Sequence, residues 1–222
     1  MLSRTLEHLR RAVPIPSHRV AVLFCPALTE KRFNKEQKKI SPVSRFLGSR
    51  YRDFIAKQAV LFDWPDYCAR IALPVSLQLK EIEHRTKAVV MVDATFQIFK
   101  QAILSGNFDV LFIVTHHPDM GETLHFEFAN GAYSLDEVAA LFQKKNPDKR
   151  ISTIFFTCQS RQVESGLYGQ VPGLESVAYA DWNMPLGDGL NFLRLWIEFL
   201  DGKTTLADAW HKASREVIHG ML

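Results

Sequence analysis

The sequence lacks the features of a secreted or membrane-spanning protein. Its three cysteines, Cys25, Cys68 and Cys158, are too few and odd in number for a disulfide framework. No apolar run approaches the roughly 20 residues that a membrane helix needs. Arg4 and Glu7 interrupt the apolar pattern of the first residues, which disfavours a secretory signal. We therefore expect a cytoplasmic protein that has no membrane partner.

The sequence also has no large excess of charge of one sign. Lysine and arginine number 27 against 24 acidic residues, so the net charge is only +3 and lacks the footprint of a nucleic-acid-binding protein. One basic stretch spans residues 31–41, and we expect it to be an exposed loop. Its cationic residues are Lys31, Arg32, Lys35, Lys38 and Lys39. Nucleic-acid contact through this stretch is the alternative to plain solvation, and a direct nucleic-acid ligand is not expected.

What the chain does contain is enough apolar sequence, 47% of its residues, for one sizeable core. Short β-branched or aromatic runs predict strands at residues 19–25, 88–92, 110–115, 124–128, 151–157 and 176–180. Helical spacing predicts helices at residues 2–13, 42–62, 94–104, 135–143, 188–200 and 205–218. Because strands and helices alternate, the sequence predicts an α/β fold with a mainly parallel sheet.

Several local signals refine this prediction. Residues 71–79 are interpreted as an edge strand or an irregular segment, because Pro74 cannot donate a ladder hydrogen bond. Asp93 is predicted to cap the helix that follows it. Ser134 and Glu137 have the spacing of a capping box at the start of another helix.

Two of the predicted strands end in residues that can carry chemistry. The strand at 110–115 runs into His116 and His117, and the strand at 151–157 runs into Cys158. Residues just past the carboxyl ends of parallel strands face the ligand crevice of an open sheet. If these strands are neighbours, a thiol nucleophile and an imidazole base share one crevice, as a cysteine hydrolase requires.

Plainer interpretations compete with this one. A cysteine at a strand end is most often a small core residue, as we expect for Cys25, and adjacent histidines are often an exposed loop pair. A metal site at His116 and His117 has no cysteine or carboxylate at the usual ligand spacing. We expect no metal and no cofactor. His125, which alternates with phenylalanines, is expected on the surface of a half-buried strand.

The residues around these strand ends resemble the CHAT group of caspase-like cysteine peptidases. In that family one apolar strand ends in the catalytic histidine and a later one ends in the catalytic cysteine, often as Ala-Cys-Gln-Ser. Here the corresponding sequences are VLFIVTHH, with His116, and TIFFTCQS, with Cys158. Between them, FANGAYSLDEVAALF is similar to the family's short β segment and helix. After the cysteine, SVAYADWNMP, NFLRLWIEFLDGK and TTLADAWHKASREV are similar to its last strand and closing helices.

The resemblance implies a caspase-like three-layer sandwich whose mainly parallel central sheet is flanked by helices. It implies one domain over residues 1–222, with a recognisable core at 86–218 and an unmatched part at 1–85. The implied catalytic dyad is His116 and Cys158. The backbone N–H groups of His117 and Cys158 would form the oxyanion hole, and Asp181 and Trp182 would line the substrate pocket.

The expected function is therefore that of a cysteine endopeptidase acting on a protein substrate. The family context suggests a bacterial defence or cell-death pathway and an activating partner or regulatory domain. One departure from the family pattern is His117, which stands where a glycine usually follows the catalytic histidine. The alternative is a catalytically silent caspase-like module that binds or regulates a partner.

Overall fold

The computed structural model describes residues 14–35, 63–115, 119–120, 123–144, 151–156, 174–178 and 186–220. The chain forms two compact units, Met1–Pro26 with Gln78–Leu222 and, inserted between them in sequence, Ala27–Leu77. The elements are η2 (Ser17–Arg19), β1 (Val20–Phe24), α3 (Trp64–Tyr67), η3 (Cys68–Ala72), α4 (Leu73–Thr86), β2 (Val89–Val92), α5 (Phe96–Ser105), β3 (Val110–Val114), β4 (Asp119–Met120), β5 (Thr123–Phe128), β6 (Gly131–Ser134), α6 (Leu135–Gln143), β7 (Ile151–Phe156), β8 (Leu174–Ala178), α8 (Leu186–Glu198) and α9 (Leu206–Gly220).

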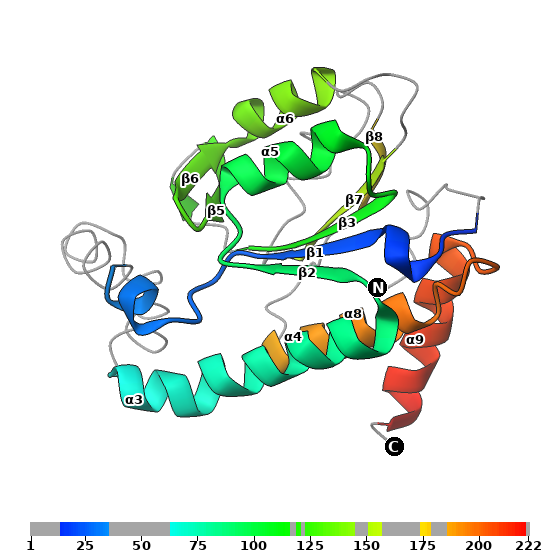
Figure 1. The fold of residues 1–222 in the computed structure, drawn as a ribbon, viewed down its shortest axis with the longest axis horizontal. Helices are drawn as coiled ribbons and strands as arrows, with labels where there is room; N and C mark the ends of the chain where they lie inside the picture. The colour runs from blue at the N-terminus through cyan, green and yellow to red at the C-terminus, as the bar shows by residue number, and fades with distance from the viewer. Residues whose placement is uncertain are drawn as a thin grey trace. The chain divides into compact units, whose positions relative to one another are not determined.

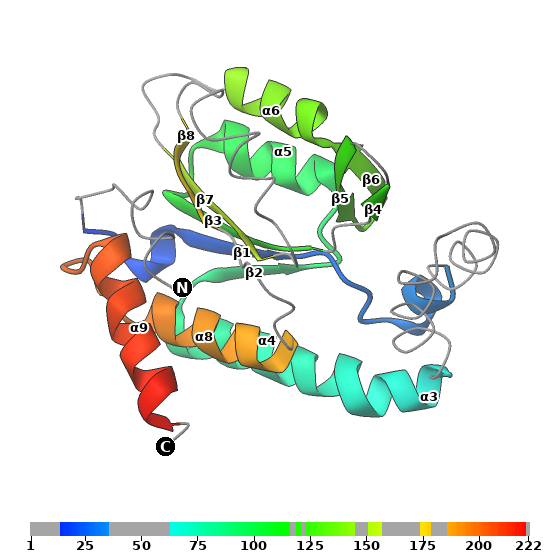
Figure 2. The same cartoon turned by 180° about the vertical axis from the view of Figure 1, so that it is seen from behind.

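The larger unit is built on a parallel sheet with strand order β2-β1-β3-β7-β8. Helices α5 and α6 lie on one face of the sheet, and α8, α9 and the part of α4 from Gln78 lie on the other (Figures 1 and 2). The predicted α/β fold with a parallel sheet flanked by helices is thereby confirmed. β8 begins two residues before the predicted strand at 176–180.

Burial explains why β1 and β3 have no polar side chains. β1 (VAVLF) and β3 (VLFIV) are buried along their whole length, as expected where helices cover both faces of a parallel sheet. The edge strand β2 is less covered, and Val89 and Val92 remain 39% and 49% exposed. The middle of the sheet is therefore the most deeply buried part of this unit.

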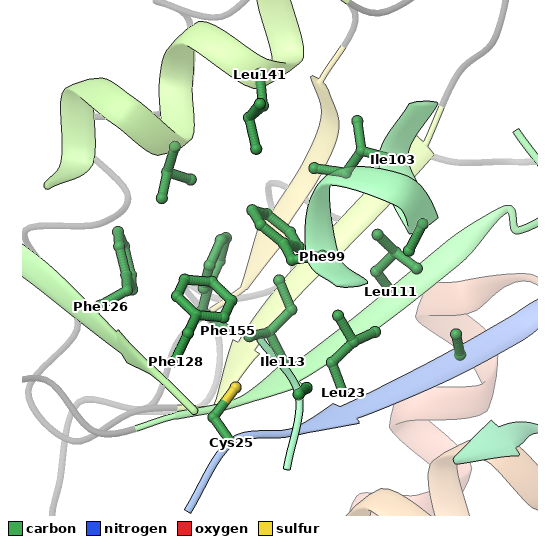
Figure 3. Close-up of a cluster of buried hydrophobic side chains, with 14 of the residues drawn as sticks. Leu23, Cys25, Phe99, Ile103, Leu111, Ile113, Phe126, Phe128, Leu141 and Phe155 are labelled. Atoms are coloured by element: carbon green, nitrogen blue, oxygen red, sulfur yellow. The ribbon is translucent and has the colours of Figure 1, made fainter. Parts of the chain in front are cut away.

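The core on the α5 and α6 face is a single apolar cluster, drawn in Figure 3. Alternate residues of the strands, such as Leu23, Ile113 and Phe155, point into it. Phenylalanine rings fill its centre, with Phe126 and Phe155 centroids 4.9 Å apart. This cluster joins α5, α6 and β5 to the sheet.

The opposite face has a different centre, the indole of Trp196 on α8. Its ring packs edge-on against Phe112 of β3, with centroids 5.0 Å apart. Its buried Nε1–H donates to the backbone oxygen of Leu206 at the start of α9, at 2.9 Å. Outside this core, Arg85 and Arg194 both pair with the Glu198 carboxylate, at 2.6 and 2.7 Å, and so link α4 to α8.

The hairpin and helix between β3 and β7 follow the sequence signals. β5 and β6 pair antiparallel through a turn at Ala129 and Asn130, one residue before the turn that the Asn130-Gly131 pair favours. At the start of α6, the Ser134 hydroxyl accepts from the Glu137 N–H and the Glu137 carboxylate accepts from the Ser134 N–H. The predicted capping box is confirmed.

The prediction for residues 71–79 was wrong, because this segment lies in a helix rather than a strand. Val75, Leu79 and Ile82 of α4 are buried at helical spacing. Pro74 is tolerated because the preceding turn, η3, is a π-helix, in which the N–H of Leu73 donates to the carbonyl of Cys68. Such a widened turn accommodates a residue that cannot donate an ordinary helical hydrogen bond.

The predicted cap of α5 was also wrong. Asp93 has a left-handed φ of 50°, and the next N–H, that of Ala94, donates to the carbonyl of Phe24 in β1. The helix therefore begins later, and its cap is Thr95, whose hydroxyl accepts from the N–H of Ile98 at 3.2 Å. Gly106, in a left-handed conformation, ends the helix.

The smaller unit contains α3, η3, the first turn of α4 and a helical segment at residues 30–35. The prediction of an exposed loop was therefore wrong for residues 31–35 of the basic stretch, which are helical. Phe33 is 6% exposed because its ring packs on Tyr67, at 4.6 Å between centroids, and on Trp64, at 5.7 Å. The Tyr67 hydroxyl donates to the Ala27 carbonyl at 3.0 Å. The predicted helices at 2–13 and 42–62, and the rest of the basic stretch, lie outside the described residues.

Candidate functional site

The carboxyl ends of β3 and β7 are the centre of the candidate site. The two strands are parallel neighbours, and their last residues, Val114 and Phe156, are partners in the register. Thr115 extends the pairing by one step, since its N–H donates to the Phe156 carbonyl at 3.2 Å. The two strands that precede the candidate histidine and cysteine therefore end side by side at the same edge of the sheet.

The candidate residues themselves lie just beyond these strands. His116, His117, Cys158, Asp181 and Trp182 all fall outside the described residues, so no distances join them. What the structure brings together is Thr115, which directly precedes His116 in sequence, and Phe156, which precedes Cys158 by two residues.

Thr115 ties this edge of the sheet to the neighbouring hairpin. Its side chain is buried, with 4% exposure. Its hydroxyl donates to the carbonyl oxygen of Glu127 on β5, at 2.5 Å. Sequence reasoning missed this contact, and the available signal was a polar residue at the end of a fully apolar strand. The partner is a backbone atom, which no sequence pattern identifies.

The end of β1 reaches the same edge of the sheet. The N–H of Cys25 donates to the Val114 carbonyl at 2.9 Å, and the cysteine side chain, 2% exposed, belongs to the apolar cluster (Figure 3). Cys25 is therefore a core residue, as the sequence predicts. Cys68 lies in the smaller unit, in η3, and is partly exposed. His125, which we expected on the surface, is half-buried on β5.

The opposite, amino-terminal edge of the sheet holds a partly exposed, bidentate ion pair. The Arg19 guanidinium donates to both carboxylate oxygens of Asp109, at 3.0 and 3.2 Å. This hydrogen bonding raises the pKa of Arg19 above its ordinary value. The pair ties the segment before β1 to the segment before β3 and lies at the other end of these strands from the candidate site.

Comparison with known proteins assigns no family to the chain. It matches no protein family model, and no curated protein sequence is detectably similar to it. Within the described residues, no group of three or more histidine, cysteine, aspartate or glutamate side chains is placed to hold a metal ion. In the same part of the chain, no helix has the length and apolar character that crossing a membrane requires.

Proposed function

We propose that this chain is a caspase-like cysteine endopeptidase of the CHAT type, in which His116 and Cys158 form the catalytic dyad. The single observation that carries the proposal is the pairing of β3 with β7. These two strands are parallel neighbours in the sheet, and their carboxyl ends are in register at Val114 and Phe156. Consecutive Cα atoms are about 3.8 Å apart, so the chain allows at most about 4 Å from Thr115 to His116 and about 8 Å from Phe156 to Cys158.

The order of the elements supports the same proposal. Between the histidine strand and the cysteine strand, the resemblance implies a short β segment and a helix. The structure has the small antiparallel sheet of β4, β5 and β6 there, followed by α6. After β7 come β8 and the helices α8 and α9, in the order that the family pattern has them.

The proposed chemistry is acyl transfer to a thiol followed by hydrolysis. His116 takes the proton of Cys158, and the thiolate attacks the carbonyl carbon of the scissile peptide bond. The backbone N–H groups of His117 and Cys158 stabilise the oxyanion that forms on the carbonyl oxygen. His116 then protonates the leaving amine as the C–N bond breaks. Water, deprotonated by His116, attacks the thioester and restores the free thiol.

Substrate choice is assigned to the residues after β8. Asp181 would pair with a basic side chain at the residue before the scissile bond, because charge-assisted hydrogen bonds to a carboxylate are strong. Trp182 would supply an apolar wall beside it. The substrate is a protein, an activating partner controls the enzyme, and the setting that the resemblance suggests is cytoplasmic bacterial defence or cell death.

A second candidate function is a catalytically silent caspase-like module that binds a partner. The observation that favours it is His117, which replaces the glycine that usually follows the catalytic histidine. Glycine adopts backbone conformations that other residues avoid, and the oxyanion donor depends on that backbone. Loss of the donor would leave the fold intact and the chemistry slow.

The deciding experiment is alkylation of the native protein with dilute iodoacetamide between about pH 5 and about pH 9, followed by peptide mass mapping. The variants are Cys158→Ala and His116→Ala. We expect Cys158 to react fastest, to remain reactive below about pH 7, and to lose this reactivity in His116→Ala. Cys25 and Cys68 serve as internal controls. If Cys158 reacts no faster than Cys68, with or without His116, the resting protein holds no activated thiol and the silent module is favoured.

A further inference from the structure

We propose that Thr115 is a positioning residue, which holds the end of β3 so that the side chain of the next residue, His116, meets Cys158. The inference rests on the proposed function. Three neighbouring strands hold this strand end in place. The Val114 carbonyl accepts from Cys25 after β1, the Thr115 N–H donates to Phe156 of β7, and the Thr115 hydroxyl donates to the Glu127 carbonyl of β5.

Of these three hydrogen bonds, two join backbone atoms, and only the bond from the Thr115 hydroxyl is made by a side chain. Thr115 is buried, and a hydrogen bond gains strength where water is excluded. Its acceptor is fixed in place, because Phe126 and Phe128 on either side of Glu127 are 0% and 1% exposed in the apolar cluster. From His125 to Phe128, β5 is also paired with β6. The Thr115 hydroxyl thus connects the histidine strand to a strand outside the sheet whose neighbouring side chains are buried.

Removal of this hydroxyl has a chemical consequence. The carbonyl of Glu127 loses a donor that water cannot easily replace, and the strand end gains freedom one residue before His116. A dyad depends on a nucleophile and a base within hydrogen-bond reach, and a displacement of about 1 Å lowers the rate of such a step about 100-fold. Thr115 therefore acts on the reaction through His116 and needs no contact with the substrate.

The sheet offers a matched control for a substitution at this position. Thr153 of β7 is also fully buried, at 0% exposure, and it faces the same side of the sheet as Phe155. Its hydroxyl has no hydrogen-bond partner among the described residues. Thr153→Val and Thr115→Val make the same chemical change at two buried positions of adjacent strands. Only the second change removes a hydrogen bond.

The test compares the pH profile of Cys158 alkylation by iodoacetamide in wild type, Thr115→Val, Thr115→Ser, Thr153→Val and His116→Ala, all as the full chain. We expect Thr115→Val to lower the rate near pH 6.5 by about 10-fold to about 100-fold, towards that of His116→Ala. Thr115→Ser keeps the donor and should restore most of the rate. Thr153→Val should match wild type.

Each other result overturns a specific statement. A wild-type profile in folded Thr115→Val, while His116→Ala still lowers the rate, overturns the role of Thr115 and leaves the dyad standing. An equal loss in Thr153→Val shows a general weakening of the sheet and overturns it too. If wild type itself shows no dependence on His116, the proposed function fails first. If Thr115→Val does not fold by circular dichroism, folded Thr115→Ala, which also lacks the hydroxyl, takes its place. A rate lowered towards that of His116→Ala supports the inference, and a wild-type rate refutes it.

Discussion

The two faces of the parallel sheet are held by different kinds of contact. On the α5 and α6 face, the cluster around Phe155 and Phe126 consists of apolar side chains, and beside it the buried Thr115 hydroxyl donates to the Glu127 carbonyl. On the α8 and α9 face, Trp196 combines ring packing with a buried hydrogen bond to Leu206, and the ion pairs of Glu198 lie beside it. Packing on the first face depends mainly on the volume and shape of the side chains. On the second face, the hydrogen bond from Trp196 to Leu206 also fixes the orientation of α8 relative to α9. From this difference we expect the apolar cluster to contribute most to stability, and the polar contacts to set how the helices α8 and α9 meet.

The largest effect is expected from a cavity on the apolar face. Phe155→Ala removes a ring that is 0% exposed between β7 and β5, and the free energy of unfolding should fall by about 3–5 kcal/mol. Urea denaturation followed by circular dichroism measures this loss. The matched control is Leu104→Ala on α5, where the side chain is 41% exposed and the loss should be much smaller. Equal losses would contradict the importance of this cluster.

An intermediate effect is expected on the other face. Trp196→Phe keeps an aromatic ring against Phe112 but removes the Nε1–H that donates to Leu206, so the backbone oxygen loses its partner. We expect the free energy of unfolding to fall by about 1–3 kcal/mol. The same urea titration measures it. A change as large as that of Phe155→Ala would show that the two faces do not differ as described.

The smallest effect is expected at the turn between α8 and α9, and it depends on pH. The Asp201 carboxylate accepts from the N–H groups of Lys203 and Thr204, at 2.8 and 2.9 Å, and these bonds lower the pKa of Asp201 below its ordinary value of 3.8. A lowered folded-state pKa contributes stability above the unfolded value, which is lost as pH falls through the folded value. Wild type should therefore melt slightly higher than Asp201→Asn at about pH 7. The gap should shrink as the pH falls below 3.8 and through the lowered folded-state pKa of Asp201.

Thermal melts of wild type and Asp201→Asn, at about pH 7 and in acid, measure this difference. A gap that persists in acid would show that the carboxylate charge is not its source. The result also bears on the comparison of the two faces, because this turn joins α8 to α9. The turn is also tied to the segment before β1, since the Gly202 N–H donates to the Ile15 carbonyl and the Ile15 N–H donates to the Thr204 carbonyl.

The sequence predicts the elements whose signals are local. The runs of β1 and β3 have no polar residues to allow another interpretation, and the capping box of Ser134 and Glu137 needs only four residues to be recognised. The predictions for residues 31–35 and 71–79 were wrong because the structure of these segments depends on features that the local sequence does not show. Phe33 is buried only because Trp64 and Tyr67 pack on it, and Pro74 is tolerated only because a widened turn precedes it.

For the candidate site, the sequence places His116 and Cys158 after two strands but does not say that these strands are neighbours. That information lies in the sheet order, in which β3 pairs with β7 although β5, β6 and α6 separate them in sequence. The link from Thr115 to Glu127 was beyond reach for a related reason. It joins a side chain to a backbone atom of another sheet, and backbone atoms carry no sequence signal.

The position of β1 has a consequence for how the protein comes into being. This strand lies between β2 and β3 in the sheet, yet both partners follow it late in the chain, and the Arg19–Asp109 pair that closes the same pairing spans 90 residues. Closing so long a loop is slow compared with forming local helices. During synthesis the apolar segment Val20–Phe24 emerges first and stays without its sheet partners until β2 and β3 have left the ribosome. Until then this apolar segment needs protection from mispairing.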